Sequence, residues 1–266
     1  MMTRRIARAG ALSYADCGRG AALVLMHGFP VDSRMWESQI AELSGPYRVV
    51  APDLRGFGQS HAQDPFKMES QADDVHALLE QIDALPCVLA GLSMGGYIAL
   101  AYLRKYPGDL LGLVLVDTKA EADTAEQREG RQKMIELVRV QGARAVADQM
   151  LPKMLAEDTP RRRPSVAQAL RAMMEACPPK TIENALAAMR DRPDQTANLP
   201  FIAAPTLIIV GDADAITPVS VAQSMQRQIP RAQLAEIKGA GHMSPMEQPA
   251  QVNQALARFL DKRQAH

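Results

Sequence analysis

The chain of 266 residues has few aromatic residues, little cysteine and no net charge. Phe, Tyr and Trp make up 4% of it, with a single Trp, and 30 basic residues balance 30 acidic ones. A balanced charge gives no field that attracts nucleic acid or an anionic membrane, so we expect neither as a partner. The hydrophobic content of 47% is ordinary for a soluble globular protein, and the length suffices to bury a large core.

Cysteines and long apolar runs are also scarce. Cys17, Cys87 and Cys177 are scattered without the spacing of a metal site or a disulfide framework. Their low, odd number is typical of a reducing compartment, and we expect a cytoplasmic protein. No apolar run approaches the roughly 18 residues of a membrane span, and none follows the paired arginines near the N-terminus as an export signal requires.

Short apolar runs alternate along most of the chain with segments of helical periodicity. The runs are nearly continuous in apolar residues, as in parallel strands covered on both faces. They span residues 22–28, 47–53, 87–93, 110–117, 205–212 and 234–242. The helical patterns span residues 33–44, 68–84, 95–106, 218–229 and 249–262. This alternation predicts an α/β fold with a mostly parallel open sheet flanked by helices, to which residues 7–18 add an antiparallel edge.

The alternation stops between residues 119 and 198, where only helical patterns remain. Four amphipathic segments occur there, at residues 128–141, 143–155, 165–177 and 181–190. We interpret this stretch as an inserted helical segment, with residues 1–118 and 199–266 forming the core domain.

The predicted insertion contains no Phe, Tyr or Trp but six methionines. Methionine fills irregular apolar space and adapts to what it touches. Met150 and Met154, together with Met243 from the core, are our candidates for an aliphatic substrate pocket. Packing between helices is the alternative role for each of these side chains.

A glycine-rich turn surrounds Ser93. The pentapeptide from Gly91 to Gly95 fits G-x-S-x-G and lies between an apolar strand and a helical pattern. This strand–turn–helix context is what a nucleophile elbow requires, whereas the bare pattern also arises by chance. The start of the helix directs free N–H groups and a partial positive charge toward the turn. We therefore predict that Ser93 is a nucleophile.

A serine hydroxyl needs a base within hydrogen-bonding distance. His242 is the last residue of the 234–242 run and lies in the glycine-rich segment that leads into a loop, at the end of the sheet where open α/β sheets bind ligands. His27 ends a strand near the same edge, and we expect it to hold nearby backbone instead. His242 is therefore the predicted base.

A carboxylate must orient the imidazole and stabilise its protonated form. Asp214 lies a little way along the loop after the 205–212 strand and is our first choice. Asp117, at the end of the preceding strand, and Asp212, directly after its own strand, are the alternatives, in that order. The chain order Ser93, Asp214, His242 is the order expected for this architecture.

The tetrahedral intermediate of acyl transfer needs two hydrogen-bond donors for its oxyanion. The backbone N–H of Met94, directly after the predicted nucleophile, is one candidate. The backbone N–H of Phe29, in the loop after the 22–28 strand, is the other. This chemistry requires neither a metal nor an organic cofactor, and we expect none.

Four blocks of the sequence carry a resemblance to the α/β-hydrolase superfamily. They are HGFP (27–30), DLRGFGQS (53–60), GLSMGG (91–96) and the segment from GDADAITP to GAGHMSPMEQP (211–249). The similarity covers residues 20–118 and 199–262. It implies a Ser-His-Asp triad and a helical cap, at 119–198, that covers the active site. We expect the second block to fix a loop structurally rather than to take part in chemistry.

Within this superfamily the chain most closely resembles carboxylesterases and hydrolases of the 3-oxoadipate enol-lactonase type. Haloalkane dehalogenases and epoxide hydrolases attack with a carboxylate, whereas this chain offers Ser93. Carbon–carbon hydrolases usually carry a Trp after the catalytic His, where this chain has Met243. The resemblance therefore implies a small-molecule ester or lactone as substrate. A small-molecule receptor, a cofactor-free lyase and a perhydrolase on the same fold are the alternatives.

Overall fold

The six apolar runs and the N-terminal edge form an eight-stranded sheet in the computed structural model, which describes residues 5–9, 12–61 and 64–264. Its strand order is β1-β2-β4-β3-β5-β6-β7-β8. The strands are β1 (Arg5–Ala9), β2 (Leu12–Cys17), β3 (Ala22–Met26), β4 (Arg48–Pro52), β5 (Cys87–Leu92), β6 (Leu110–Val116), β7 (Thr206–Gly211) and β8 (Gln233–Ile237). Strands β3 to β8 pair in parallel, and β2 runs antiparallel to both β1 and β4. The predicted fold class and its antiparallel edge are confirmed.

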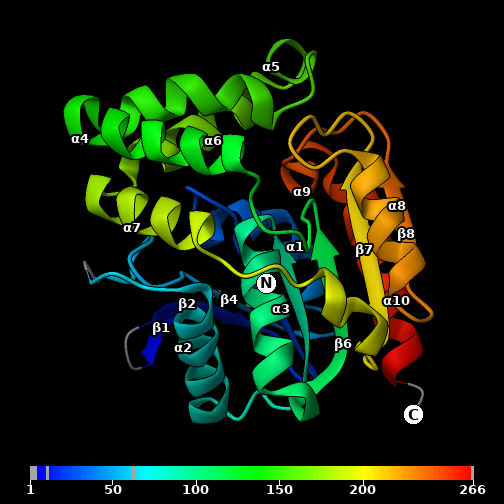
Figure 1. Ribbon diagram of the computed structural model, residues 1–266. Coiled ribbons are helices and arrows are strands. Elements are labelled where there is room, and N and C mark those ends of the chain that lie inside the picture. The colour runs from blue at the N-terminus through cyan, green and yellow to red at the C-terminus, as the bar shows by residue number, and fades with distance from the viewer. Residues whose placement is uncertain (1–4, 10–11, 62–63, 265–266) are drawn as a thin grey trace.

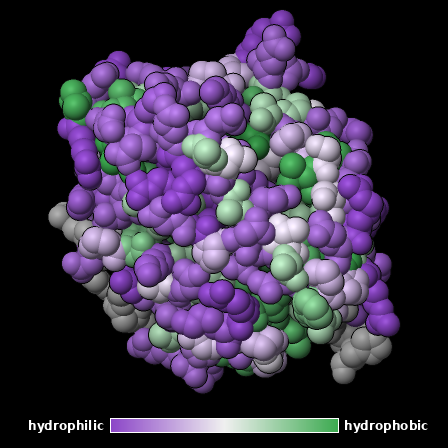
Figure 2. Space-filling view, viewed as in Figure 1, coloured by the Kyte–Doolittle hydropathy of each residue, from purple (hydrophilic) through white to green (hydrophobic). Residues whose placement is uncertain are grey.

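Helices cover both faces of the sheet (Figure 1). They are α1 (Glu37–Leu43), preceded by the short η1 (Ser33–Trp36), and α2 (Met68–Gln81), α3 (Met94–Lys105), α8 (Val219–Gln228) and α10 (Pro249–Gln264). Side chains alternate between faces along each strand: Val24 and Met26 join the core under α2, α3 and α8, while Leu23 and Leu25 join the core under α1 and α10. Both faces are therefore buried, which explains the nearly continuous apolar runs. The outer surface seen in Figure 2 is largely hydrophilic.

The last strand is shorter than predicted. Strand β8 ends at Ile237, not at residue 242. Gly239 has a φ of +68°, which a strand cannot accommodate, and the N–H of Ala213 donates to the carbonyl of Ala240 in the following loop. As a result His242 is placed on a loop above the end of β7, not on a strand.

Four helices lie above the carboxyl ends of the parallel strands (Figure 1), and we call them the cap helices. They are α4 (Ala125–Met154), α5 (Thr159–Arg162), α6 (Pro164–Ala176) and α7 (Pro179–Arg190). Gly142, with φ +76° and ψ −175°, interrupts α4 between the two predicted helical patterns. After α7 the short η3 (Thr196–Phe201) leads back to β7. None of the helices in the described ranges is both long and apolar enough to cross a membrane.

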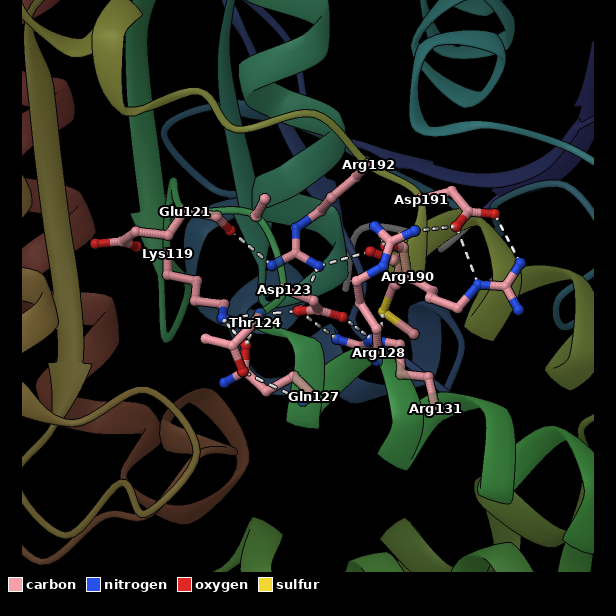
Figure 3. A network of polar contacts seen from close by, with 12 residues as sticks. Lys119, Glu121, Asp123, Thr124, Gln127, Arg128, Arg131, Arg190, Asp191 and Arg192 are labelled. Carbon is pink, nitrogen blue, oxygen red and sulfur yellow. Dashed lines mark hydrogen bonds and ion pairs between the residues drawn. The ribbon is translucent and has the colours of Figure 1, made fainter.

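Buried charges join the two connections between the sheet and the cap helices (Figure 3). The Arg192 guanidinium donates through Nη1 to Asp123 Oδ1 at 2.7 Å and through Nη2 to the carbonyl of Glu121 at 2.7 Å. It also lies 4.0 Å from the centroid of the Tyr97 ring on α3. The chain segments entering and leaving the cap helices are thereby fixed to each other and to α3. The outer limits of the predicted core domain, residues 1 and 266, lie outside the described residues.

Candidate active site

Ser93 occupies a sharp turn between β5 and α3. Its φ of 52° and ψ of −110° lie where residues other than glycine are uncommon. The turn is held from β6, because the Ser93 N–H donates to the carbonyl of Val116 at 2.9 Å. The hydroxyl of Thr118 donates to the carbonyl of Ser93 at 2.8 Å. These contacts fix a strained backbone at the residue predicted to be the nucleophile.

The three glycines around Ser93 allow neighbouring backbone to pass closely. A Cβ on Gly91 would lie 2.2 Å from the carbonyl oxygen of Gly95, and one on Gly95 would lie 2.5 Å from that of Met26. A Cβ on Gly96 would lie 2.4 Å from the hydroxyl oxygen of Thr118. No side chain larger than hydrogen fits at these positions without a shift of the backbone or of Thr118. The glycines therefore bring the end of β3 and the start of α3 together at the serine.

The loop after β3 lies against the same turn. A Cβ on Gly28 would be 3.6 Å from Ser93 Cβ, which places the predicted donor Phe29 in a segment next to the serine. Met94 is the first residue of α3, so its N–H has no partner within the helix. His27 holds this loop: its Nε2 accepts from the Leu54 N–H at 3.0 Å, as expected for a structural histidine. Burial lowers the pKa of His27, which keeps this acceptor neutral.

The structure pairs His242 with Asp214. The imidazole Nδ1 lies 2.8 Å from Asp214 Oδ2, and both side chains are buried. The other carboxylate oxygen, Oδ1, accepts from the N–H groups of Ile216 and Thr217, and Oδ2 also accepts from the Thr217 hydroxyl at 2.6 Å. A carboxylate with this many donors is fixed in orientation, and it holds the proton of the imidazole on Nδ1.

Electrostatics within the pair favour its charged form. Burial opposes ionisation of Asp214, but the charge of His242 and the hydrogen bonds from His242 and Thr217 hold the pKa of Asp214 below its usual value. Burial also opposes a charge on His242, but the hydrogen bond and negative charge of Asp214 raise the pKa of His242 above its usual value. This arrangement stabilises an imidazolium, as a general base needs after it has taken a proton.

Neither alternative carboxylate is hydrogen-bonded to the imidazole. Asp117 is fully buried at a φ of 44°, where its Oδ1 accepts from the Gly211 N–H at 2.8 Å and its Oδ2 lies 2.5 Å from the hydroxyl of Ser244. Asp212, directly after β7, accepts from the N–H of Gly239 in the loop after β8. The bond to Ser244 joins residues 127 positions apart, and no sequence signal indicates it.

Ser93 is connected to the residues around His242 through the end of β6, and no hydrogen bond joins its hydroxyl to the imidazole. Val116, which accepts from the Ser93 N–H, directly precedes Asp117, and Asp117 contacts Ser244 on the loop of His242. Within the described part of the chain, Ser93 Oγ has no hydrogen-bond partner. Catalytic hydrogen bonds are often long in the free enzyme and shorten when substrate binds.

The candidate pocket methionines are mostly buried against other side chains. Met154 and Met243 belong to the core cluster of α1 and α10, and Met150 is half-buried between the two core clusters. Their role in a substrate pocket stays a prediction. A different cap methionine, Met173 of α6, borders a cavity of about 450 Å³ beside the loop that follows Phe29. This cavity is lined by Tyr14, Ala15, Val31, Asp32, Ser33, Arg34, Asp53, Phe57, Gly58, Gln59, Met173, Ala176 and Cys177.

The described ranges contain no group of three or more His, Cys, Asp or Glu side chains that could hold a metal ion. Cys17, Cys87 and Cys177 are buried and form no disulfide. The polar groups at the site are thus those of a serine, an imidazole, carboxylates and backbone amides.

The family of the chain follows from comparison with known proteins. Residues 21–249 match the family model of the alpha/beta hydrolase fold, so the chain belongs to this family. The resemblance found in the four sequence blocks is confirmed.

Individual relatives show which kinds of hydrolase the chain resembles. The chain is 32% identical over 255 residues to the AB hydrolase superfamily protein YisY of Bacillus subtilis, covering 92% of this chain and 93% of YisY. The structure of a thermophilic esterase from Thermogutta terrifontis is similar with a TM-score of 0.92 and 41% identity, covering 99% of both chains. The enol-lactonase from Burkholderia xenovorans LB400 follows with a TM-score of 0.88 and 26% identity, covering 94% of this chain and 96% of that one. These likenesses support hydrolase chemistry at the site.

The close packing at the turn gives a prediction about stability. We expect Gly95→Ala to lower the free energy of unfolding by about 1–3 kcal/mol, because its Cβ would overlap backbone that cannot move freely. Gly130→Ala is the control: its Cβ would meet nothing within 4 Å on α4, and alanine should stabilise the helix by up to about 1 kcal/mol. Urea unfolding of both variants measures the difference. Equal effects would contradict the packing explanation.

The burial of Asp117 gives a second prediction, on the pH dependence of stability. Burial and the negative charge of Asp214 raise the pKa of Asp117 to about 8, from an ordinary value of 3.8. Between these values the folded protein holds a proton on Asp117 that the unfolded chain has lost, so stability falls as the pH rises through this window.

Asp117→Asn cannot ionise and keeps the shape of the side chain. We expect the unfolding free energy of the variant to decline less between pH 5 and pH 8 than that of the wild type. Urea titrations at several pH values test this. Parallel pH dependences for the two proteins would show that Asp117 is not the titrating group.

Proposed function

We propose that the protein is a serine hydrolase that cleaves carboxylic esters or lactones through an acyl-enzyme intermediate. The observation that carries this proposal is the buried His242–Asp214 pair, on loops that follow β7 and β8, at the same end of the sheet as the strained turn of Ser93 after β5. The likeness to a thermophilic esterase and to an enol-lactonase supports the same class of substrate.

Each residue has a distinct role in the proposed reaction. Ser93 Oγ attacks the carbonyl carbon of the substrate while His242 Nε2 accepts the hydroxyl proton, and Asp214 stabilises the imidazolium that results. The N–H groups of Phe29 and Met94 donate to the oxyanion of the tetrahedral intermediate. His242 then protonates the leaving alcohol, and a water molecule attacks the acyl-enzyme by the reverse sequence of proton transfers.

The substrate is proposed to lie between the core and the cap helices. Residues 119–198 would act as the cap domain that covers Ser93, with Met150, Met154 and Met243 on the apolar side of the site. Ester and lactone substrates share the same mechanism, since a lactone is a cyclic ester whose leaving alcohol stays attached to the acyl group. No metal or organic cofactor has a role in these steps.

The nucleophile is tested by replacing its hydroxyl. We expect Ser93→Ala to abolish turnover of short-chain p-nitrophenyl esters while the unfolding transition is retained, because no other group can form the acyl-enzyme. A serine-directed phosphonate should add one mass label to the wild type, at Ser93, and none to the variant. A variant that keeps a near-wild-type rate would exclude Ser93. A labelled wild type that turns over no ester or lactone would favour the receptor alternative.

The carboxylate that orients the imidazole of His242 is tested by comparing two isosteric substitutions. We expect Asp214→Asn to lower kcat by about 10⁴-fold, because the amide cannot hold the imidazole in the productive tautomer. Asp117→Asn should lower kcat by less than about tenfold, because Asp117 contacts Ser244 and not the imidazole. Steady-state kinetics with one ester substrate measure both values, and the reverse order would assign the acid to the end of β6.

A further inference from the structure

One buried carboxylate links the loop of His242 to the cap helices. Glu247, at the end of the short α9 (Ser244–Glu247), has no exposed surface. Its Oε1 accepts from the N–H of Gly241, the residue before His242, at 2.8 Å. Its Oε2 accepts from the N–H of Ala156, between α4 and α5, at 2.8 Å and from the hydroxyl of Thr159, the first residue of α5, at 2.6 Å. The two oxygens are therefore divided between the histidine loop and the cap.

Backbone contacts bring the same two segments together. The N–H of Met243 donates to the carbonyl of Met154 at 3.1 Å. A Cβ on Gly241 would lie 2.5 Å from the backbone nitrogen of Ala156, so only glycine permits this approach. The Arg163 guanidinium also donates to the backbone carbonyl of Glu247. Residues on both sides of His242 thus contact the cap directly.

The charged groups around the imidazole come from three elements. Asp214 lies after β7, Asp117 directly after β6, and Glu247 at the end of α9, and the negative charge of each of them, where it is ionised, favours a protonated imidazole. Of these three, Glu247 is the one whose side chain also bonds to the cap. A movement of the cap segment would therefore change the surroundings of His242 through this residue.

We propose that Glu247 is a positioning residue that couples the placement of the cap to that of the catalytic imidazole. The proposal rests on the proposed role of His242 as general base. A carboxylate bonded at both oxygens transmits a displacement of residues 156–159 to the peptide that precedes His242. A misplacement of about 1 Å far from the reacting atoms can cost about a hundredfold in rate. Substrate contacts that fix the position of the cap helices would in this way also fix the position of the His242 imidazole.

Two threonines of the cap provide a matched test. Thr159 and Thr181 are both buried, and the hydroxyl of each donates to the core: Thr159 to Glu247, and Thr181 to the carbonyl of Gly56 at 2.9 Å. We expect Thr159→Ala to lower kcat about tenfold and to shift the acid limb of the pH–rate profile. Thr181→Ala should stay within about twofold of the wild type with an unchanged profile. Thr159→Ser, which keeps the hydroxyl, should restore both rate and profile.

A measurement without substrate separates this proposal from that of the hydrolase. The imidazole protons of His242 should titrate by proton NMR at a different pH in Thr159→Ala than in the wild type, and at the wild-type value in Thr181→Ala. Glu247→Gln, which turns one acceptor oxygen into a donor, should lower the pKa of His242, because a negative charge is lost.

The results of these experiments distinguish the positioning role of Glu247 from the proposed hydrolase reaction. Titrations that shift in a protein that hydrolyses no ester would support the coupling and refute the proposed reaction. Unchanged His242 titrations in both Thr159→Ala and Glu247→Gln, or equal effects of the two threonine substitutions, would overturn the positioning role and leave Glu247 as a structural residue.

Discussion

The hydrogen bond between His242 and Asp214 is the interaction on which the rest of the site depends. It joins the loop after β7 to the loop after β8 and occupies Nδ1, so that Nε2 is the nitrogen that accepts the proton in the proposed reaction. The pair is buried, so its partner charges are little screened, and each stabilises the ionised form of the other. Parallel strands make this possible, because they bring the loops that follow β5, β7 and β8 to one edge of the sheet.

Close approach of backbone is the second constraint, and it recurs on both sides of the site. Gly91, Gly95 and Gly96 let β3, β5 and α3 meet at Ser93, and Gly241 lets the histidine loop lie on the cap segment at Ala156. At Gly91, Gly95 and Gly241 two main chains pass, and at Gly96 the main chain passes the side chain of Thr118; glycine at these positions costs conformational entropy on folding. The glycines thus set how near Ser93 and His242 lie to the elements that hold them.

The sequence predicted the sheet well because buried parallel strands are apolar on both faces, and runs such as 87–93 differ clearly from amphipathic helices. It overextended the last strand, since the left-handed backbone of Gly239 is not visible in an apolar pattern. The motif around Ser93 and the loop of His242 were recognisable, but the choice between Asp214 and Asp117 depends on side-chain direction. The bonds from Asp117 to Ser244 and from Glu247 to the cap span loops far apart in the chain, so they follow from tertiary packing alone.

The buried ion pair between Asp123 and Arg192 also limits which recombinations could transfer the cap helices between this chain and its relatives. Asp123 lies before the cap helices and Arg192 after them, and their side chains are 1% and 3% exposed. A recombination that carried over Arg192 without Asp123 would leave the buried guanidinium without its carboxylate partner, at a cost of about 3–5 kcal/mol. A transferred insertion therefore keeps this contact only when Asp123 and Arg192 are transferred together, with the guanidinium of Arg192 over the ring of Tyr97 on α3.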